Sequence, residues 1–402
     1  MNTLSRQLSP EETEAFGREL DAVKHDVEAD LGQRDVDHIR DVIRTARRTE
    51  TAGRSLLHFG VDPLSFCAGV AALSVSKILE NMEVGHNVMH GQYDWTKDKA
   101  LDSHSYDWDI VCAAEHWRHS HNYEHHTYTN VLGKDRDIGY AFLRISPEQQ
   151  WNFTHLAQPV TAGFLALFFQ WGVATHDLRF VETFKGEQSV AELLERSRPF
   201  VKKAAWQVAK DYAFYPALSL WNAPRVALGN GIANGIRNLW TFAIIFCGHF
   251  PEGVRIYSEE EAKDESRGAW YVRQLNGSAN IEGSRTFHVM SGHLSHQIEH
   301  HLFPDVPAAR YPEMAPRVRA ICEKYGQTYN TGSFRKQLGS VIGRIFANAL
   351  PSKVSKTSKT SNAPMTSKQA RRALREEVAP KAIRTLKKLP KVFGAKHAAL
   401  AA

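Results

Sequence analysis

The sequence predicts an all-α protein, in which a helical membrane domain carries a histidine-rich cap on its cytoplasmic side. Two features of the chain lead to this fold class. Histidines recur at intervals of four residues, and residues at that spacing share one face of a helix. Several apolar stretches approach the ~20 residues that a helix needs to cross a bilayer. The mean hydropathy of −0.40 is low for a protein of many membrane helices, although polar ends of the chain dilute this average.

Composition divides the 402 residues into four segments. The first is charged, and its apolar residues recur at threes and fours, as in Leu20, Val23 and Val27, which predicts a soluble helical segment. The second holds the apolar stretches and is the predicted membrane domain. A connecting segment and a basic tail, predicted to be disordered, complete the chain. In order, the segments are residues 1–55, 56–330, 331–351 and 352–402.

Four apolar stretches within the second segment are candidate membrane spans. One precedes a histidine cluster that begins at His86, and three lie between further clusters that begin at His121 and His296. Clusters that share one site must lie on one side of the bilayer, which requires an even number of crossings between them. One of the three stretches is therefore expected to be interfacial or re-entrant, or two of them form one broken element. The stretches are Leu56–Leu79, Phe153–Thr175, Tyr212–Leu228 and Ile232–Phe250.

The three histidine clusters carry the strongest chemical signal. The first, His86-Asn-Val-Met-His90, has the form H-x3-H, and the other two both have the form H-x3-H-H. Neutral imidazole is a ligand for iron, zinc and copper. Eight imidazoles exceed the four ligands of one tetrahedral zinc and suit two metal ions. The eight are His86, His90, His121, His125, His126, His296, His300 and His301.

The spacing within each cluster suggests which histidines share an ion. Residues i and i+4 lie one helical turn apart, so His86 and His90 are expected to bind the same ion. The same argument pairs His121 with His125. The next residue lies about 100° further round the helix. His126, and its counterpart in the third cluster, are therefore expected to reach a second ion beside the first.

At these clusters the chain resembles the integral-membrane fatty acid desaturase family. That family carries boxes of the form H-x3-4-H, H-x2-3-H-H and (H/Q)-x2-3-H-H, in this order. The third box extends here as His296-Gln-Ile-Glu-His-His-Leu-Phe-Pro304, which is similar to bacterial, mycobacterial-type acyl-CoA and acyl-lipid desaturases. The resemblance covers roughly residues 55–320. It implies a membrane enzyme that uses two Fe ions and O2 to introduce a double bond into a long acyl chain.

The resemblance also implies one further metal ligand. His249 closes the last apolar stretch, and the family places a ligand at the corresponding end of a late membrane helix. A capping or interface role is the alternative for a histidine in this position. Some relatives carry an asparagine one turn earlier, where this chain has Ile245, so no role of that asparagine is carried over.

Carboxylates near the clusters are candidates to orient the histidines, because a metal-bound imidazole usually donates its second nitrogen to such a group. Glu83, Glu115 and Glu299 lie beside the three clusters. Asp135 and Asp137 follow the second cluster and are either such partners or part of a charged loop. Three histidines outside the repeated pattern are expected to be surface or supporting residues; they are His116, His119 and His293.

The implied reaction requires an external reductant. O2 is reduced to water while the acyl chain loses two hydrogens, so two further electrons must be supplied. The sequence contains neither the His-Pro-Gly-Gly motif of a fused cytochrome b5 nor a GxGxxG motif. A separate donor is therefore expected, either a ferredoxin or an NADPH-dependent reductase. The expected substrate is a long-chain fatty acyl group, linked to CoA or to a lipid, and membrane lipid is the expected surrounding.

Cysteine usage and charge bear on the location. The four cysteines are scattered without a C-x-x-C pair, which favours a reduced compartment, and no cleaved signal peptide is expected. These features indicate a bacterial inner (cytoplasmic) membrane with the site facing the cytoplasm. Thirteen Lys or Arg against two Glu give residues 352–402 a charge of +11, so the rest of the chain sums to −5. Because the basic balance belongs to the tail, no nucleic-acid partner is expected.

Two other functions are compatible with the clusters. Hydroxylases, epoxygenases and ketolases share the three boxes, so the nearest alternative is an enzyme that inserts oxygen into an alkyl or carotenoid chain. The mass of the product separates the two, since desaturation removes two hydrogens and insertion adds one oxygen. A more remote alternative is a non-catalytic metal-binding membrane protein, which would not require O2 and would tolerate zinc.

Overall fold

The computed structural model describes residues 5–351 and confirms the all-α fold class. Within these residues, the only strands are two short segments that pair in parallel, β1 (Asn280–Glu282) and β2 (Thr331–Ser333). The longer helices are α1 (Pro10–Ala29), α2 (Gln33–Phe59), α3 (Pro63–Leu79), α10 (Val190–Ala209), α12 (Ala223–His249), α16 (Tyr311–Lys324) and α17 (Phe334–Asn348). The tail predicted for residues 352–402 lies outside the described residues.

Shorter helical segments connect these elements. The α-helical ones are α4 (Asn87–Met89), α5 (Ala114–Trp117), α6 (His126–Tyr128), α7 (Gln158–Leu167), α8 (Phe169–His176), α9 (Phe180–Lys185), α11 (Tyr215–Leu218), α13 (Arg267–Asn276), α14 (Arg285–Met290) and α15 (Gln297–Leu302). The π-helical ones are η1 (Glu80–His86), η4 (Arg118–His125) and η7 (Lys210–Phe214). The 3-10 turns are η2 (Asp94–Thr96), η3 (Lys99–Leu101), η5 (Ile138–Ala141), η6 (Phe153–Ala157), η8 (Leu220–Asn222), η9 (Leu294–His296) and η10 (Ala308–Arg310).

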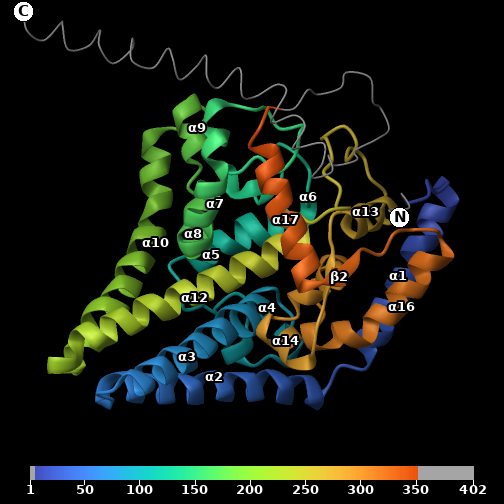
Figure 1. Cartoon of the computed structure of the whole chain (residues 1–402). Helices are drawn as coiled ribbons and strands as arrows, with labels where there is room; N and C mark the ends of the chain where they lie inside the picture. Colours follow the sequence, from blue (N-terminus) through green and yellow to red (C-terminus); the bar gives the residue numbers. More distant parts are fainter. Residues whose placement is uncertain (1–4, 352–402) are drawn as a thin grey trace, which may run out of the picture.

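Helix α1 forms where the sequence predicts an amphipathic helix. Ser9 and Glu12 make a reciprocal capping box at its start, which satisfies backbone donors that the first turn leaves free. The spaced apolar residues Leu20, Val23 and Val27 are buried, as predicted. They share a core with side chains of α13, α15 and α16, and Figure 1 shows α1 beside α16. The N-terminal helix therefore packs directly on the part of the chain that carries the third histidine cluster.

Helices α2 and α3 form a closely packed antiparallel hairpin (Figure 1). The segment boundary predicted at residue 55 falls inside α2, which continues to Phe59. The two helices approach each other closely at Gly53. A Cβ atom there would lie 2.7 Å from the backbone nitrogen of Leu73 and 2.9 Å from the carbonyl oxygen of Gly69. A glycine is required at this crossing because a larger residue would push the helices apart.

The predicted membrane spans are only partly confirmed. In the described chain, one helix is long and apolar enough to cross a membrane, the continuous run Pro63–Met89 formed by α3, η1 and α4. It begins and ends later than the predicted Leu56–Leu79. The candidate span Phe153–Thr175 is bent by 92° between Phe153–Leu167 and Phe169–His176. A bend of this size is expected for a broken span or a re-entrant loop. A re-entrant loop is one of the arrangements that would give an even number of crossings between the second and third histidine clusters.

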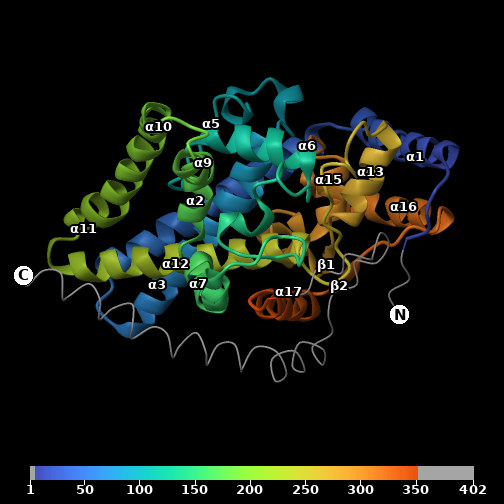
Figure 2. The same ribbon diagram turned by 90° about the horizontal axis from the view of Figure 1, so that it is seen from above.

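In the described chain, neither of the last two candidate spans forms a helix that is long and apolar enough to cross a membrane. The stretch Tyr212–Leu228 is divided between η7, α11, η8 and the start of α12. The stretch Ile232–Phe250 lies within α12, which ends at His249. Helix α12 crosses the centre of the molecule, where it contacts α3, α7, α8 and α17 (Figures 1 and 2). Its stacked side chains Phe242 and Phe246, with ring centroids 3.9 Å apart, form the middle of the largest apolar core. Helix α12 thus delivers His249 into the protein interior.

Candidate metal centre

The histidine clusters lie on helical segments with widened turns. His86 ends the π-helical segment η1, and His121 and His125 both lie in the π-helical segment η4. Single π-helical turns are rare in proteins, but those that occur are frequently found at functional sites, where the wider turn changes the direction of the side chains. The third cluster begins at the last residue of the 3-10 turn η9 and continues into α15. The helical placement of the clusters is confirmed, although the segments are not the regular α-helices that the spacing argument assumed.

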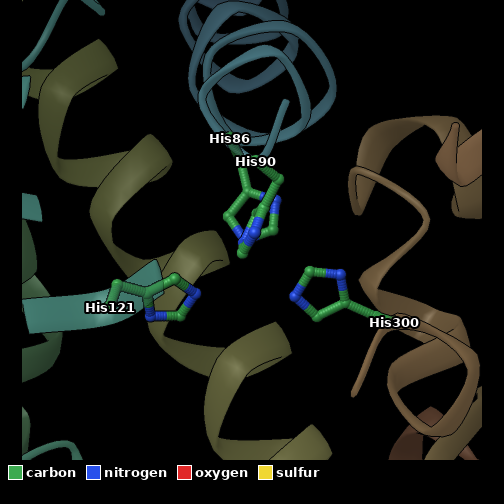
Figure 3. A group of neighbouring side chains, drawn as sticks. All are labelled: His86, His90, His121 and His300. Atoms are coloured by element: carbon green, nitrogen blue, oxygen red, sulfur yellow. The ribbon is translucent and has the colours of Figure 1, made fainter. Parts of the chain in front are cut away.

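Four histidines form the first group. Each of His86, His90, His121 and His300 offers a ring nitrogen, and these nitrogens all lie within 4.8 Å of one another. Figure 3 shows the four rings converging from three directions on one central point. His86 and His300 are buried, with ring centroids 4.9 Å apart. Segments that are more than 200 residues apart in sequence therefore meet here.

A second group lies directly beside the first. The ring nitrogens of His125, His126 and His301 lie within 4.8 Å of one another, and all three side chains are buried. His249 joins them from the end of α12, because its Nε2 lies 3.3 Å from Nε2 of His301. Its ring centroid is 4.8 Å from that of His125. The position of His249 matches the ligand role expected for it better than the capping alternative.

The chemistry of these groups fits two metal ions. Ring nitrogens of His90, His121, His125, His126 and His300 are buried without a hydrogen-bond partner. Burial and the neighbouring histidines hold the pKa values of His126, His300 and His301 well below the ordinary range, so these imidazoles are neutral. Buried polar atoms are normally paired, and lone pairs that face one another are stabilised by a cation between them. The residues therefore fit the pair of ions that the sequence predicts.

The pairing of histidines differs from the spacing argument. His86 and His90 do share a group, as expected. His121 belongs with the first group and His125 with the second, but these two histidines also form a close group with Asp137, so their sharing of an ion stays a prediction. The adjacent histidines of the third cluster are divided in the same way, His300 in the first group and His301 in the second. The two clusters of the form H-x3-H-H therefore bridge the two groups.

Carboxylates orient the second cluster from outside. Nδ1 of His125 donates to Asp135 at 3.0 Å, and Nδ1 of His121 donates to Asp137 at 3.2 Å. Burial alone would lower the pKa of His125, but Asp135 and Asp137 outweigh it and raise that pKa. A carboxylate behind an imidazole fixes its tautomer and increases its basicity as a ligand. Of the two alternatives left open for these aspartates, the structure supports partners of the histidines.

Neutral groups hold two other histidines in a similar way. Nδ1 of His86 lies 3.0 Å from Oδ1 of Asn87. Nδ1 of His301 lies 3.1 Å from Oε1 of Gln274 and 3.2 Å from the hydroxyl of Thr129. Each of these contacts occupies Nδ1 and leaves Nε2 free to face the group. The sequence offered no signal for Gln274 or Thr129, because both lie far from the clusters that they support.

Glu83 and Glu299 do not orient the cluster histidines as expected. Glu83 is fully buried and binds His38 at 2.7 Å and His293 at 2.9 Å. Glu299 instead accepts hydrogen bonds from Asn280 and Tyr329. Glu83, His38 and His293 form a third close group of potential metal ligands. Hydrogen bonds satisfy this triad internally, and it links α2 and η1 to the approach of the third cluster.

The position of His296 does not match its expected role. His296 lies in neither group, and its nearest ring contact is His288, with ring centroids 4.6 Å apart. The next residue, Gln297, reaches the second group instead, because its side-chain amide nitrogen lies 3.1 Å from Nε2 of His249. Gln297 was missed although a signal was present. The form (H/Q)-x2-3-H-H also fits Gln297-Ile-Glu-His-His301, with glutamine in the first position.

The other flanking residues lie outside the two groups. His119 is half-exposed on its side chain and pairs with Asp177 at 3.0 Å. His116 is buried but belongs to none of the ligand groups of the described chain, and Glu115 is exposed. These positions agree with the supporting roles expected for His116 and His119. His293 is held by Glu83, as described above.

A cavity opens from the first group between α12, α8 and η1. It is narrow, with a cavity volume of about 40 Å³. His86 and His121 form its wall on the side of the metal centre, and Trp117, stacked on His121 at 4.5 Å, extends that wall. Ile245, the residue that replaces an asparagine of some relatives, also lines it. The aromatic and aliphatic walls suit a hydrocarbon chain more than a polar metabolite.

Comparisons with known proteins agree with this geometry. The sequence profile of the family described as "Fatty acid desaturase" matches residues 63–333, more than half of the chain. The NADPH-dependent stearoyl-CoA 9-desaturase of Mycobacterium tuberculosis (strain CDC 1551 / Oshkosh) is 41% identical over 350 residues, which cover 86% of this chain and 82% of the relative.

More distant relatives have the same type of activity in their names. The sn-1 linoleoyl-lipid 6-desaturase of Synechocystis sp. is 27% identical over 271 residues, which cover 65% of this chain and 74% of the relative. Fatty acid desaturase 3 of Homo sapiens is 26% identical over 230 residues, which cover 56% of this chain and 48% of the relative. With the family profile and the mycobacterial relative both covering most of its length, this chain belongs to the fatty acid desaturase family and is an oxidoreductase of that class.

Proposed function

We propose that this enzyme introduces a double bond into a long-chain acyl-CoA with two iron ions and O2. One observation supports the proposal most directly. Two adjacent groups of buried imidazoles direct unpaired nitrogens inward, and an apolar cavity reaches the first of them. When bound, the two iron ions would activate O2 and supply the oxidising power that no side chain has.

The proposed ligands follow the two groups. The first ion is held by His86, His90, His121 and His300. The second is held by His125, His126, His301 and His249. Gln297 is proposed as a further neighbour of the second ion, since rotation of its amide can present oxygen to the same point. His296 is not included because it lies beside His288 instead.

The surrounding residues fix the imidazoles. Asp135 and Asp137 hold the Nδ1 protons of His125 and His121, so Nε2 is the ligating atom in both. The overall reaction removes two hydrogens from adjacent methylene carbons and consumes one O2, two protons and two electrons, giving two waters. The buried setting of the groups excludes bulk water, which would otherwise compete for the site.

The proposed substrate is a long acyl chain carried on CoA. The mycobacterial relative is named as a stearoyl-CoA 9-desaturase, whereas the cyanobacterial relative is named for a lipid-linked substrate. The mycobacterial relative has the higher identity, which favours a CoA thioester over a lipid. The apolar walls of the cavity, including Trp108, Phe169 and Ile245, suit the hydrocarbon part of such a molecule.

We also propose a separate electron donor and a membrane location. The name of the mycobacterial relative includes dependence on NADPH, so electrons from NADPH are proposed to arrive through a ferredoxin or a reductase. The helix Pro63–Met89 is proposed to enter the bacterial inner membrane, with the metal centre on the cytoplasmic side. Exposed apolar side chains of neighbouring helices support contact with lipid; they are Phe164, Leu167, Trp206, Leu218, Trp221 and Leu228.

Reconstitution tests this proposal. The iron-loaded chain, purified in detergent, is supplied with stearoyl-CoA, O2, NADPH and a ferredoxin with its reductase. The expected product has lost two hydrogens, and metal analysis should give two irons per chain. A product that has gained one oxygen atom would support the hydroxylase alternative. Protein that consistently contains a single zinc and turns over no acyl-CoA would contradict the proposal.

A further inference from the structure

The cavity beside the metal centre ends in a polar region. Along α12, Ile245, Thr241 and Arg237 line it at successive turns back from His249. Arg237 lies twelve residues from His249, about 18 Å along the helix axis. Across the cavity, Asn81 of η1 binds the hydroxyl of Thr241 at 3.2 Å. The cavity therefore leads from His86 and His121 towards a polar floor between α12 and η1.

Arg237 is a buried cation without a paired anion. Its exposed fraction is 2%. Its guanidinium donates to Oδ1 of Asn238 at 3.1 Å, and it forms no ion pair with any carboxylate of the described chain. Other arginines with buried side chains, such as Arg310 and Arg273, each bind a carboxylate directly. An unpaired buried charge is costly, so its retention here calls for an explanation from the cavity that it faces.

The nearby carboxylates are committed to lysines. Asp211 acts on Arg237 electrostatically, but its Oδ2 is bound by Nζ of Lys77 at 3.0 Å. Asp109 also acts on Arg237, but it is bound by Lys210. Two lysines and two carboxylates thus pair with each other, and Arg237 lies near them without a direct contact to either carboxylate. Of these five charged side chains, only Arg237 lines the cavity. Because the other four pair with each other, the positive charge left over is that of Arg237.

An unsatisfied polar atom lies in the same region. Oδ1 of Asn81 is buried without a hydrogen-bond partner, and Asn81 also lines the cavity. A hydrocarbon chain that covered the guanidinium N–H groups of Arg237 or the carbonyl oxygen of Asn81 would offer these polar groups no hydrogen-bond partner. Leaving such a group unsatisfied costs about 1–3 kcal/mol for a neutral group and more for a charged one. A methyl or methylene group is therefore excluded from contact with this floor.

We propose that Arg237 forms the floor of the acyl pocket and limits the length of hydrocarbon that can lie beyond the metal centre. The acyl chain passes His86 and His121, and its methyl end stops before the guanidinium. This inference rests on the proposed function, because it requires an acyl substrate in the cavity. Arg237 is thus a residue that determines chain-length specificity, and it does not take part in the redox chemistry.

The first test compares turnover of saturated acyl-CoA thioesters that lengthen by two carbons at a time. Wild type should show a sharp limit in kcat/KM. In Arg237→Met, kcat/KM for the first thioester beyond that limit should rise about tenfold relative to stearoyl-CoA. The control is Arg225→Met, on the same helix but outside the cavity, where Arg225 binds Asp62 and Ser65. It should leave the limit unchanged.

The second test uses the wild-type enzyme alone, so it does not depend on how a variant folds. The compared substrates are ω-hydroxystearoyl-CoA and the unsubstituted thioester with the same number of chain atoms. A terminal hydroxyl can accept from Arg237 and donate to Oδ1 of Asn81, so the hydroxylated chain should be preferred about tenfold at the length limit. Arg237→Met should reverse that preference.

The outcomes separate this inference from the proposed function. A wild-type preference for the unsubstituted chain overturns the inference, as does an unchanged length limit in Arg237→Met that retains two metal ions. In both cases desaturation of acyl-CoA still stands. If wild type desaturates no acyl-CoA of any length, then the proposed function is wrong and this inference falls with it.

Discussion

Nδ1 of His125 lies 3.0 Å from each of the two carboxylate oxygens of Asp135, deep in the protein. The same carboxylate accepts hydrogen bonds from the backbone N–H groups of Asn130 and Asp137. Asp135 is therefore fixed by the loop that follows the second histidine cluster, and it fixes His125 in turn. The tautomer of one proposed ligand is set by a loop that contributes no ligand.

Asp135→Asn should weaken the second metal site. The amide can still form a hydrogen bond, but it removes the negative charge that makes His125 more basic. Replacing such a partner costs about 10–100-fold in metal affinity or activity. Iron retained after dialysis against a chelator measures the effect. Asp177→Asn is the matched control, because Asp177 is also buried but binds the bystander His119. Equal iron loss in both variants would contradict the proposed role of Asp135.

Removing a ligand from either group should abolish desaturation. His300→Ala takes one imidazole from the first group, and His125→Ala takes one from the second. Both should lose turnover of stearoyl-CoA, since losing a ligand changes the geometry and the potential of a redox ion. His119→Ala should retain most of the activity because His119 lies outside both groups. If His119→Ala is as inactive as His125→Ala, then the boundary between ligands and bystanders is drawn wrongly.

The third cluster offers a test between neighbouring residues. Gln297→Ala should lower activity by at least tenfold, because the amide of Gln297 touches His249. His296→Ala should have a much smaller effect, because His296 contacts His288 and no proposed ligand. Iron content and kcat, measured side by side, compare the two variants. The opposite order of effects would return His296 to the ligand set.

The crossing of α2 and α3 predicts an effect on stability. Gly53→Ala places a methyl group 2.7 Å from the backbone nitrogen of Leu73, so the helices must separate. The expected loss is about 1–2 kcal/mol, because overpacking outweighs the gain in helix propensity. Gly163→Ala in α7 is the control, since nothing lies within 4 Å of its new methyl group. Thermal unfolding in detergent should show a lower midpoint for Gly53→Ala and no fall for Gly163→Ala.

The helical fold and the histidine set could be predicted because both depend on local pattern. Spacing of three and four residues marks α1, and the repeated boxes mark the three segments that meet at the metal centre. The expectation that His121 and His125 share an ion described only part of their arrangement, because they share a close group with Asp137 but also belong to different groups. It assumed the turn of a regular α-helix, whereas η4 is π-helical and directs the two rings to different groups.

Other features depend on contacts between distant segments, which spacing does not encode. The bend of 92° between α7 and α8 interrupts a stretch that is apolar throughout, so hydropathy gave no warning of it. The support of His301 by Gln274 joins positions 27 residues apart. Gln297 is different, because its motif was visible in the sequence but the form of the box with glutamine in the first position was not considered.

His86 and His121 of the first group line the cavity, whereas no histidine of the second group lines it. The two proposed metal positions are thus inequivalent, although imidazoles surround both of them. A spectroscopic method that resolves individual irons should register two signals, and a bound acyl chain should shift one signal more than the other. The signal of the ion beside the cavity would then report the binding of substrate. The signal of the other ion, which substrate changes less, would serve as an internal reference.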